Sequence, residues 1–397
     1  MMVRFRKIFL EPLNPYVAAT LLAVGSVVFA LLLAGKLWGI TTGESQLGGH
    51  FMTALGYPAT DLAYFRKFKL PEILASGPQV HVFGLLLGGL VAALSTGEFG
   101  IRAIPRGRTL LAAVAGGILL GYGSRLAAGC NIGNFWSAFP SAGLNALTFF
   151  GGVLLGSFAT VRTAVEKGWF LSPPSKKTFT FAPRWQKVVA VALSAALVLL
   201  TVLVQPSLPV AVWFWFGIFA AYIGYRSRLC FASAYRDLFV RAGPSGRNAS
   251  AIAFGLLLQA AIFTPLFLMG TKLDFSLASG QGQLQVLLGG LLFGVGVVLL
   301  GGCIFSSAYR AGAGHVTAFI GWLSTIFIGM PLLTLHWDFW YGRVPRYLPD
   351  TSLWSWGPGY GLIIAVLVPT AWLLYALKVD GRLPAFLSGK RRVPGGA

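Results

Sequence analysis

The three cysteines of this 397-residue chain carry its clearest chemical signal. Cys130, Cys230 and Cys303 lie far apart without a C-x-x-C pair, which argues against a zinc site, and their odd number argues against a closed disulfide framework. Each ends an apolar stretch and precedes a short segment of mixed polarity. A buried cysteine is often only a small apolar residue, but a thiol is also a soft, polarizable and weakly donating group. Because the start of a helix offers free backbone N–H groups to an anion, we predict a substrate path for a soft anion that contains sulfur or selenium.

Two further polar residues are candidates for the same path. Asn131 follows Cys130 directly, within the short segment of mixed polarity. Glu44 lies early in the chain, in a segment that corresponds by position to the one that holds Cys230. The alternative for Glu44 is an ordinary carboxylate in an outer loop.

Three basic residues complete the set of candidates. Arg125 lies inside a predicted apolar span, where an ionisable side chain indicates function, although it can also extend to the outer membrane surface. Arg310 either attracts an anion or anchors its own short segment, and His315 either lines the path or has a structural role. We expect no catalytic residue, no metal ion and no cofactor.

The composition predicts the kind of fold that positions these candidate residues. Apolar residues make up 56% of the chain and charged residues 11%, whereas about 25% is usual for the charged residues of a globular domain. This excludes a soluble enzyme and predicts an all-α polytopic membrane protein. A span needs roughly 20 mainly apolar residues, which predicts about ten transmembrane helices. They are expected at 16–38, 79–97, 109–128, 142–163, 186–205, 209–228, 248–270, 283–302, 314–335 and 358–377.

The basic residues predict the orientation. The chain has 31 Lys and Arg against 11 Asp and Glu, a net charge of +20. When the amino terminus is placed inside, most of the 31 basic residues fall on the inner side of a ten-span arrangement, as the positive-inside rule requires. We therefore predict a multi-pass membrane protein with both termini in the cytoplasm. The charge reflects orientation and lipid contact rather than a nucleic-acid partner.

The chain also repeats itself. Residues 121–130 and 294–303 both read G-x-G-x5-G-C at the end of a predicted span. We predict two five-helix repeats, at 1–206 and 207–380, and a basic cytoplasmic tail at 381–397. An odd number of spans in each repeat makes the second repeat inverted, as in many transporters. The segments after the three cysteines are predicted to be short re-entrant helices, since irregular backbone at membrane depth must line a cavity or be buried in protein.

Three motifs in this order resemble the YeeE/YedE sulfur-transport family, and within it the YedE branch. They are Gly-Ser-Arg-Leu-Ala-Ala-Gly-Cys-Asn-Ile at 123–132, Arg-Leu-Cys-Phe-Ala-Ser-Ala-Tyr-Arg-Asp at 228–237 and Gly-Gly-Cys-Ile-Phe-Ser-Ser-Ala-Tyr-Arg-Ala-Gly at 301–312. The resemblance implies an inner-membrane (plasma-membrane) transporter rather than an enzyme. It also implies that Cys130, Cys230 and Cys303 pass thiosulfate inward through S–H···S contacts. Thiosulfate carriers have a further thiol early in the first half, where this chain has Glu44 and Ser45.

That departure leaves alternatives open. The YedE branch is associated with selenium metabolism, so the transported compound can instead be selenite or a related selenium compound. The cysteines can also form a persulfide relay, because nearby arginines favour a reactive thiolate. A third alternative is a scaffold for a TusA-like sulfur carrier on the cytoplasmic face, a partner that the family resemblance implies.

Overall fold

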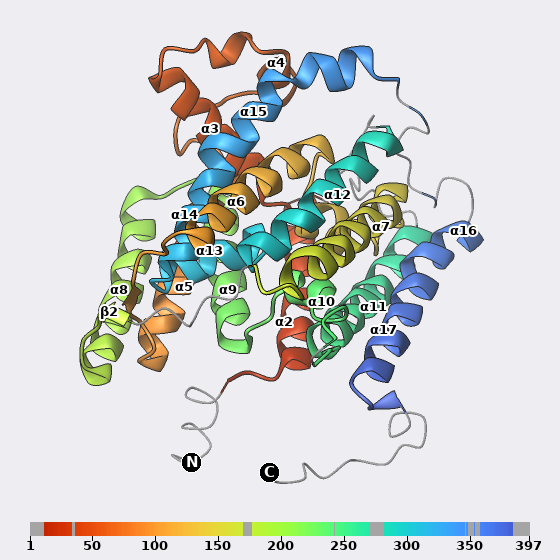
Figure 1. Cartoon of the computed structure of the whole chain (residues 1–397). Coiled ribbons are helices and arrows are strands. Elements are labelled where there is room, and N and C mark those ends of the chain that lie inside the picture. Colours follow the sequence, from red (N-terminus) through yellow and green to blue (C-terminus); the bar gives the residue numbers. More distant parts are fainter. Residues whose placement is uncertain are drawn as a thin grey trace.

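The computed structural model describes residues 12–33, 36–169, 177–241, 243–269, 282–345, 347, 353 and 358–383. Ten of its helices are long and apolar enough to cross a membrane, which confirms the prediction of about ten spans (Figure 1). The predicted basic tail lies outside the described residues from position 384 onward. The long helical stretches are α2 (Pro15–Leu32), α5 (Gly77–Thr96), α6 (Arg108–Leu126), α7 (Leu144–Thr160) with η3 (Val161–Val165), α8 (Pro183–Val204), α9 (Leu208–Ser227), α11 (Arg247–Leu268), α12 (Gln283–Leu300), α14 (Val316–Ser324) with η4 (Thr325–Gly329) and α15 (Met330–Leu335), and α16 (Pro358–Leu362) with η7 (Ile363–Leu367) and α17 (Val368–Val379).

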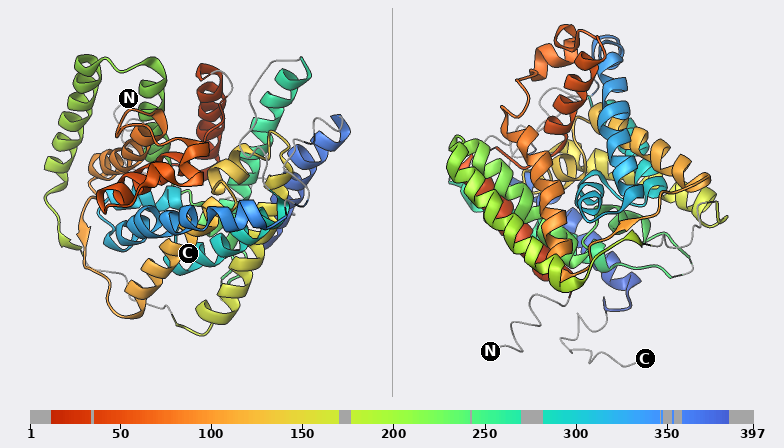
Figure 2. Two further views of the ribbon diagram at one scale, coloured as in Figure 1. Left: turned by 90° about the horizontal axis from the view of Figure 1, so that it is seen from above. Right: turned by 90° about the vertical axis from the view of Figure 1, so that its left-hand side faces the viewer.

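Shorter elements connect them. A two-stranded antiparallel ribbon joins β1 (Ile101–Arg102) and β2 (Lys177–Phe179), with Ile101 opposite Phe179. The start of α2 and the end of α17 lie on the same side of the molecule (Figures 1 and 2), as an even number of crossings requires. The short elements are α3 (Thr41–Ala54), η1 (Ala59–Asp61), α4 (Ala63–Phe68), η2 (Asn131–Ser137), α10 (Phe231–Arg236), α13 (Ile304–Gly312), η5 (Phe339–Arg343), β1 (Ile101–Arg102) and β2 (Lys177–Phe179).

Exposure of apolar side chains indicates which surfaces meet lipid. Helix α8 stands at the edge of the molecule (Figure 2) and buries only Gln186, Ala190 and Leu197. The side chains of Val191 and Leu203 are each 71% exposed. An apolar helix that is exposed on most of its surface is stable in a lipid environment and not in water.

Glycines bring the central helices into close contact. A Cβ atom added to Gly123 of α6 would lie 2.6 Å from the carbonyl oxygen of Gly289 in α12, and one added to Gly117 would lie 2.1 Å from that of Gly321 in α14. Backbones can approach this closely only where both helices present small residues. These contacts hold α6, the helix that carries Arg125, in a fixed position.

A substitution at such a contact tests this packing. Gly117→Val is expected to lower the free energy of unfolding by about 1–3 kcal/mol, because the added side chain meets a backbone that cannot move aside. Gly151→Val is the matched control, since an added Cβ meets nothing within 4 Å there. Thermal unfolding of the purified variants in detergent measures the difference. Equal unfolding midpoints for the two variants would contradict the close contact.

A short helix begins directly after each cysteine. Helices η2, α10 and α13 start at the residues that follow Cys130, Cys230 and Cys303, and each is too short to cross a membrane. Two of the thiols cap these helices: Cys130 Sγ accepts a hydrogen bond from the backbone N–H of Ile132, and Cys303 Sγ accepts one from Ser306, both at 3.4 Å. The cysteines thus occupy the N-cap position, where a side-chain acceptor satisfies a free backbone donor.

Candidate functional site

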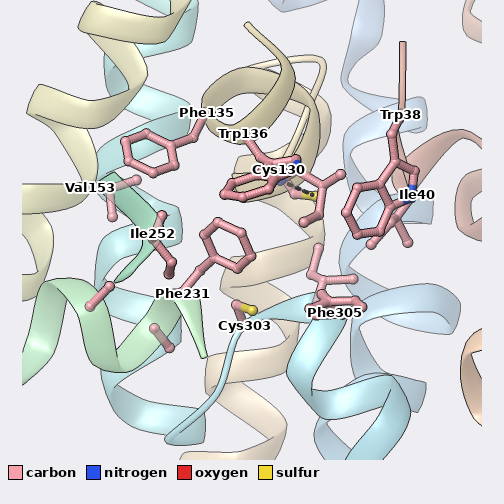
Figure 3. Packing of buried hydrophobic residues seen from close by; sticks show 14 of the residues in the cluster. Trp38, Ile40, Cys130, Phe135, Trp136, Val153, Phe231, Ile252, Cys303 and Phe305 are labelled. Carbon is pink, nitrogen blue, oxygen red and sulfur yellow. Dashed lines mark hydrogen bonds between the residues drawn. The ribbon is translucent and has the colours of Figure 1, made fainter. Parts of the chain in front are cut away.

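The cysteines lie in the interior on either side of an aromatic layer. Cys130 and Cys303 are buried, and Cys230 is half-buried. Figure 3 shows Cys130 on one side of the Phe231 ring and Cys303 on the other. The layer consists of Trp136, Phe231 and Phe305, with ring centroids 5.7 Å apart for Trp136–Phe231 and 6.5 Å apart for Phe231–Phe305. All three rings are buried, and the ring of Phe231 is the one that lies between Cys130 and Cys303.

Ser306 joins the two thiols on the far side of the layer. The Cys230 thiol donates a hydrogen bond to Ser306 Oγ at 3.3 Å, and the same oxygen accepts one from the backbone N–H of Cys303 at 2.9 Å. Because the N–H of Ser306 donates in turn to Cys303 Sγ, both thiols are tied to the first turn of α13. A soft acceptor that arrives here meets two thiols at the start of one helix.

Arg125 is held among polar side chains on the Cys130 side. Only 4% of this residue is exposed. Its Nη1 donates to the hydroxyl oxygen of Tyr64 at 2.9 Å, and its Nη2 donates to Oγ1 of Thr41. Tyr64 donates in turn to Ser45 Oγ at 2.9 Å. The guanidinium therefore points inward and does not extend to the membrane surface, which was the alternative left open by the sequence.

Glu44 is fully buried on α3 rather than exposed in an outer loop. One carboxyl oxygen, Oε1, accepts a hydrogen bond from Trp322 Nε1 at 2.8 Å. Helix α3 is not among the ten candidate spans. Burial raises the pKa of the Glu44 carboxyl to about 8, although the bond from Trp322 and the charge of Arg125 both oppose that shift. This carboxyl group is therefore largely protonated at neutral pH.

Four polar atoms near Cys130 have no hydrogen-bond partner within the described part of the chain. They are Oε2 of Glu44, Nε of Arg125, and both side-chain polar atoms of Asn131. Buried polar atoms without a protein partner are rare, so a group of them marks a place where a small polar molecule or ion can bind. Glu44 and Arg125 also act electrostatically on Cys130, so the groups share one locality. An N–H donor, an amide and a thiol beside a carboxyl group can bind a small anion that has both oxygen and sulfur atoms.

A large basic cavity lies on the predicted inner face. Its volume is about 1650 Å³, and the side chains of Arg102, Arg106, Arg236, Arg310 and His315 contribute to its lining. Arg310 Nη1 donates to the carbonyl oxygen of Gly301 at 2.9 Å, so the guanidinium anchors its own helix and still faces the cavity. Burial, followed by the charges of Arg310 and Arg102, lowers the pKa of His315 to about 3. His315 is therefore neutral at physiological pH, and the arginines supply the positive charge.

The structure thus divides the eight predicted site residues into two groups. Glu44 and Arg125 act electrostatically on Cys130, which Asn131 follows directly. Cys230 is near Cys303 and Arg310, and Arg310 lines the basic cavity together with His315. Sequence reasoning missed the side chains that position them. The missed residues are Thr41, Tyr64, Ser306 and Trp322.

Comparisons with known proteins agree with the prediction of a sulfur transporter. A family model described as sulphur transport matches residues 2–159 and 226–389. The probable transporter YedE of Salmonella typhimurium is 30% identical over 352 residues, which cover 85% of this chain and 85% of that protein. The probable transporter YedE of Escherichia coli is 28% identical over 393 residues, covering 94% of this chain and 93% of that protein. The thiosulfate transporter TsuA of Spirochaeta thermophila is 29% identical over 166 residues, or 37% of this chain and 45% of that protein.

Proposed function

Since the chain belongs to the sulphur-transport family, we propose that it takes up a small sulfur-containing anion, such as thiosulfate, along a path lined by Cys130, Cys230 and Cys303. One observation carries the proposal: each of the three cysteines directly precedes a short helix in the interior. The name of the related TsuA protein supports thiosulfate as the cargo. We also propose that the basic cavity faces the cytoplasm of an inner-membrane protein, with both termini on that side.

In the proposed path, the cargo meets the two groups of residues one after the other. A dianion from outside first meets the N–H group of Arg125, the amide of Asn131 and the thiol of Cys130, which replace part of its hydration shell. Its sulfur atom then passes the aromatic layer, whose polarizable rings suit a soft atom. On the inner side the thiols of Cys230 and Cys303 receive it, and the arginines of the cavity attract it toward release.

The architecture that we propose for this path is an inverted repeat of residues 1–206 and 207–380. In support, a long helix with the shared G-x-G-x5-G-C motif leads into a cysteine-capped short helix in both halves, as α6 and η2 and as α12 and α13. Helices α3 and α10 are the other short pair. In inverted-repeat transporters the site lies between the halves near the middle of the membrane, where we place η2, α10 and α13 as re-entrant helices.

Uptake by proteoliposomes tests the cargo. We expect the purified protein to take up labelled thiosulfate at least about tenfold faster than sulfate, because sulfate has the same charge but offers only hard oxygen atoms to the thiols. Labelled selenite is measured in parallel. Faster uptake of selenite than of thiosulfate would favour the selenium alternative. That alternative is open because this chain has the carboxyl group of Glu44 where thiosulfate carriers have a thiol. Equal rates for thiosulfate and sulfate would contradict a thiol-selected path.

The same preparation separates transport from the two remaining alternatives. In a persulfide relay, the protein exposed to thiosulfate would carry a covalent sulfur adduct on a cysteine, detectable by mass spectrometry, and the adduct would turn over. A scaffold for a TusA-like carrier would show no uptake of any of the three anions. Uptake of thiosulfate without an adduct supports transport of the intact anion.

A further inference from the structure

The carboxyl group of Glu44 has one oxygen without a hydrogen-bond partner within the described residues, and it lies near enough to Arg125 and Cys130 to act on both electrostatically. Its Oε1 is engaged by Trp322, whereas its Oε2 is buried and has no partner within the described residues. No ion pair joins Glu44 to Arg125 within the same part of the chain, although the guanidinium is near enough to act on the carboxyl group. A buried carboxyl group without an ionic partner is more stable in its neutral form.

Of the groups that surround the Glu44 carboxyl group, Arg125 is the cation that acts on it. Among the elements packed against α3, helix α5 contributes His81, whose ring is occupied by Trp38 Nε1 and the carbonyl oxygen of Trp213, and η4 and α15 contribute no titratable side chain. The cation near Glu44 is Arg125 of α6. The other titratable groups around Glu44 are Tyr64 of α4, Cys130 before η2, His81 of α5, the exposed Asp61 of η1 and His50 of α3 itself.

The protonation state of Glu44 decides whether this place attracts an anion. When Glu44 is ionised, its charge offsets that of Arg125, and Oε2 repels the oxygen atoms of an anion. When Glu44 is protonated, the O–H group at Oε2 is one more donor beside Arg125 Nε and the amide of Asn131, and the positive charge of Arg125 is no longer offset. Proton and anion therefore favour each other's binding, and by linkage the effect is reciprocal.

We propose that the outer site binds its anion together with one proton, which Glu44 holds on Oε2 and donates as a hydrogen bond to the anion. The proton comes from the solvent on the outer side, and the anion–protein complex carries one negative charge fewer than the anion alone would bring. This inference rests on the proposed function. It adds a proton-dependent step to recognition that a thiol at this position would not provide.

Isothermal titration of the purified full-length protein with thiosulfate tests the proposal. Thiosulfate is the probe because it remains a dianion throughout the range from about pH 6 to about pH 10. Above the Glu44 pKa of about 8, we expect the dissociation constant to rise toward tenfold per pH unit, whereas below it the constant is nearly independent of pH. Heats measured above that pKa in buffers of different ionisation enthalpy should show uptake of close to one proton per anion, a result that requires no variant.

Glu44→Gln locates the proton. The amide is a permanently neutral donor of similar shape, so the variant is expected to bind thiosulfate with little pH dependence and without proton uptake. Glu72→Gln, which removes an exposed carboxylate of an outer loop, is the matched control and should behave as the parent. Binding without proton uptake by the parent, or full pH dependence in Glu44→Gln, would overturn this inference and leave the proposed function standing. Absence of thiosulfate binding at every pH would instead contradict the proposed function.

Discussion

Replacing Arg125 by Gln is expected to lower thiosulfate uptake by at least about thirtyfold. Arg125 is the one guanidinium that we place at the outer end of the path, and its Nε has no protein partner within the described residues. Losing a buried, hydrogen-bonded charge that attracts a dianion costs about 2 kcal/mol or more, which corresponds to this factor. Initial rates of uptake by proteoliposomes give the measurement, normalised to the amount of protein inserted.

Two further variants distinguish this role from a general effect of charge or folding. Arg66→Gln removes an exposed arginine from α4 on the same face of the protein and should leave uptake unchanged. Arg125→Lys keeps the charge but not the planar fork that reaches both Tyr64 and Thr41, so an intermediate rate is expected. If Arg125→Gln elutes as a monodisperse protein and retains more than half of the parent rate, Arg125 has no role in binding the anion.

The helices and their cysteines were predictable because a membrane imposes a simple rule on the sequence. Each crossing needs a run of apolar residues of nearly fixed length, so spans can be read directly, and a polar interruption such as Asn131 stands out. A functional role for Arg125 could be predicted in the same way, since an ionisable residue inside an apolar span is energetically costly. Its place in the interior rather than at the membrane surface needed the structure.

The partners of the candidate residues were not predictable from spacing. Trp322 lies 278 residues from Glu44, and Tyr64 lies 61 residues from Arg125. Such contacts depend on how α3, α4 and α14 pack together, which no local pattern specifies. The spacing of Thr41 and Glu44 even matches a capping-box sequence, but the residue in the N-cap position is Ile40, and Thr41 instead accepts from Arg125. Local rules fail here because long-range polar contacts compete with them.

The thiols have a structural role that must be separated from their proposed role in transport. Cys303 Sγ accepts the hydrogen bond of an N-cap, and Ser306 completes a reciprocal capping box with the backbone N–H of Cys303. The thiol of Cys303 would therefore stabilise the start of α13 even if it made no contact with the cargo. Replacement by alanine removes the cap and the thiol together, so that its effect on uptake would have two explanations.

Cys303→Ser separates the two roles and is expected to reduce thiosulfate uptake by at least about tenfold without loss of stability. Serine is a preferred N-cap residue, so the hydroxyl retains the bond from the Ser306 N–H, whereas Cys303→Ala is expected to lose about 1 kcal/mol of stability. Uptake nevertheless falls, because a hard hydroxyl oxygen cannot replace the soft contact between sulfur atoms and holds its own hydrogen bonds more firmly. Thermal unfolding in detergent and uptake by proteoliposomes are measured on the same preparations.

The comparison of the serine and alanine variants decides between the roles. If the thiol serves only as a cap, Cys303→Ser transports like the parent and only Cys303→Ala is impaired, in proportion to its lower stability. If the thiol contacts the cargo, both variants transport slowly although only the alanine variant is destabilised. Cys130→Ser provides an independent repetition on the other side of the aromatic layer, because Cys130 caps η2 through Ile132. Normal uptake in both serine variants would exclude a path selected by sulfur–sulfur contacts and would leave Arg125 and Glu44 as the groups that recognise the anion.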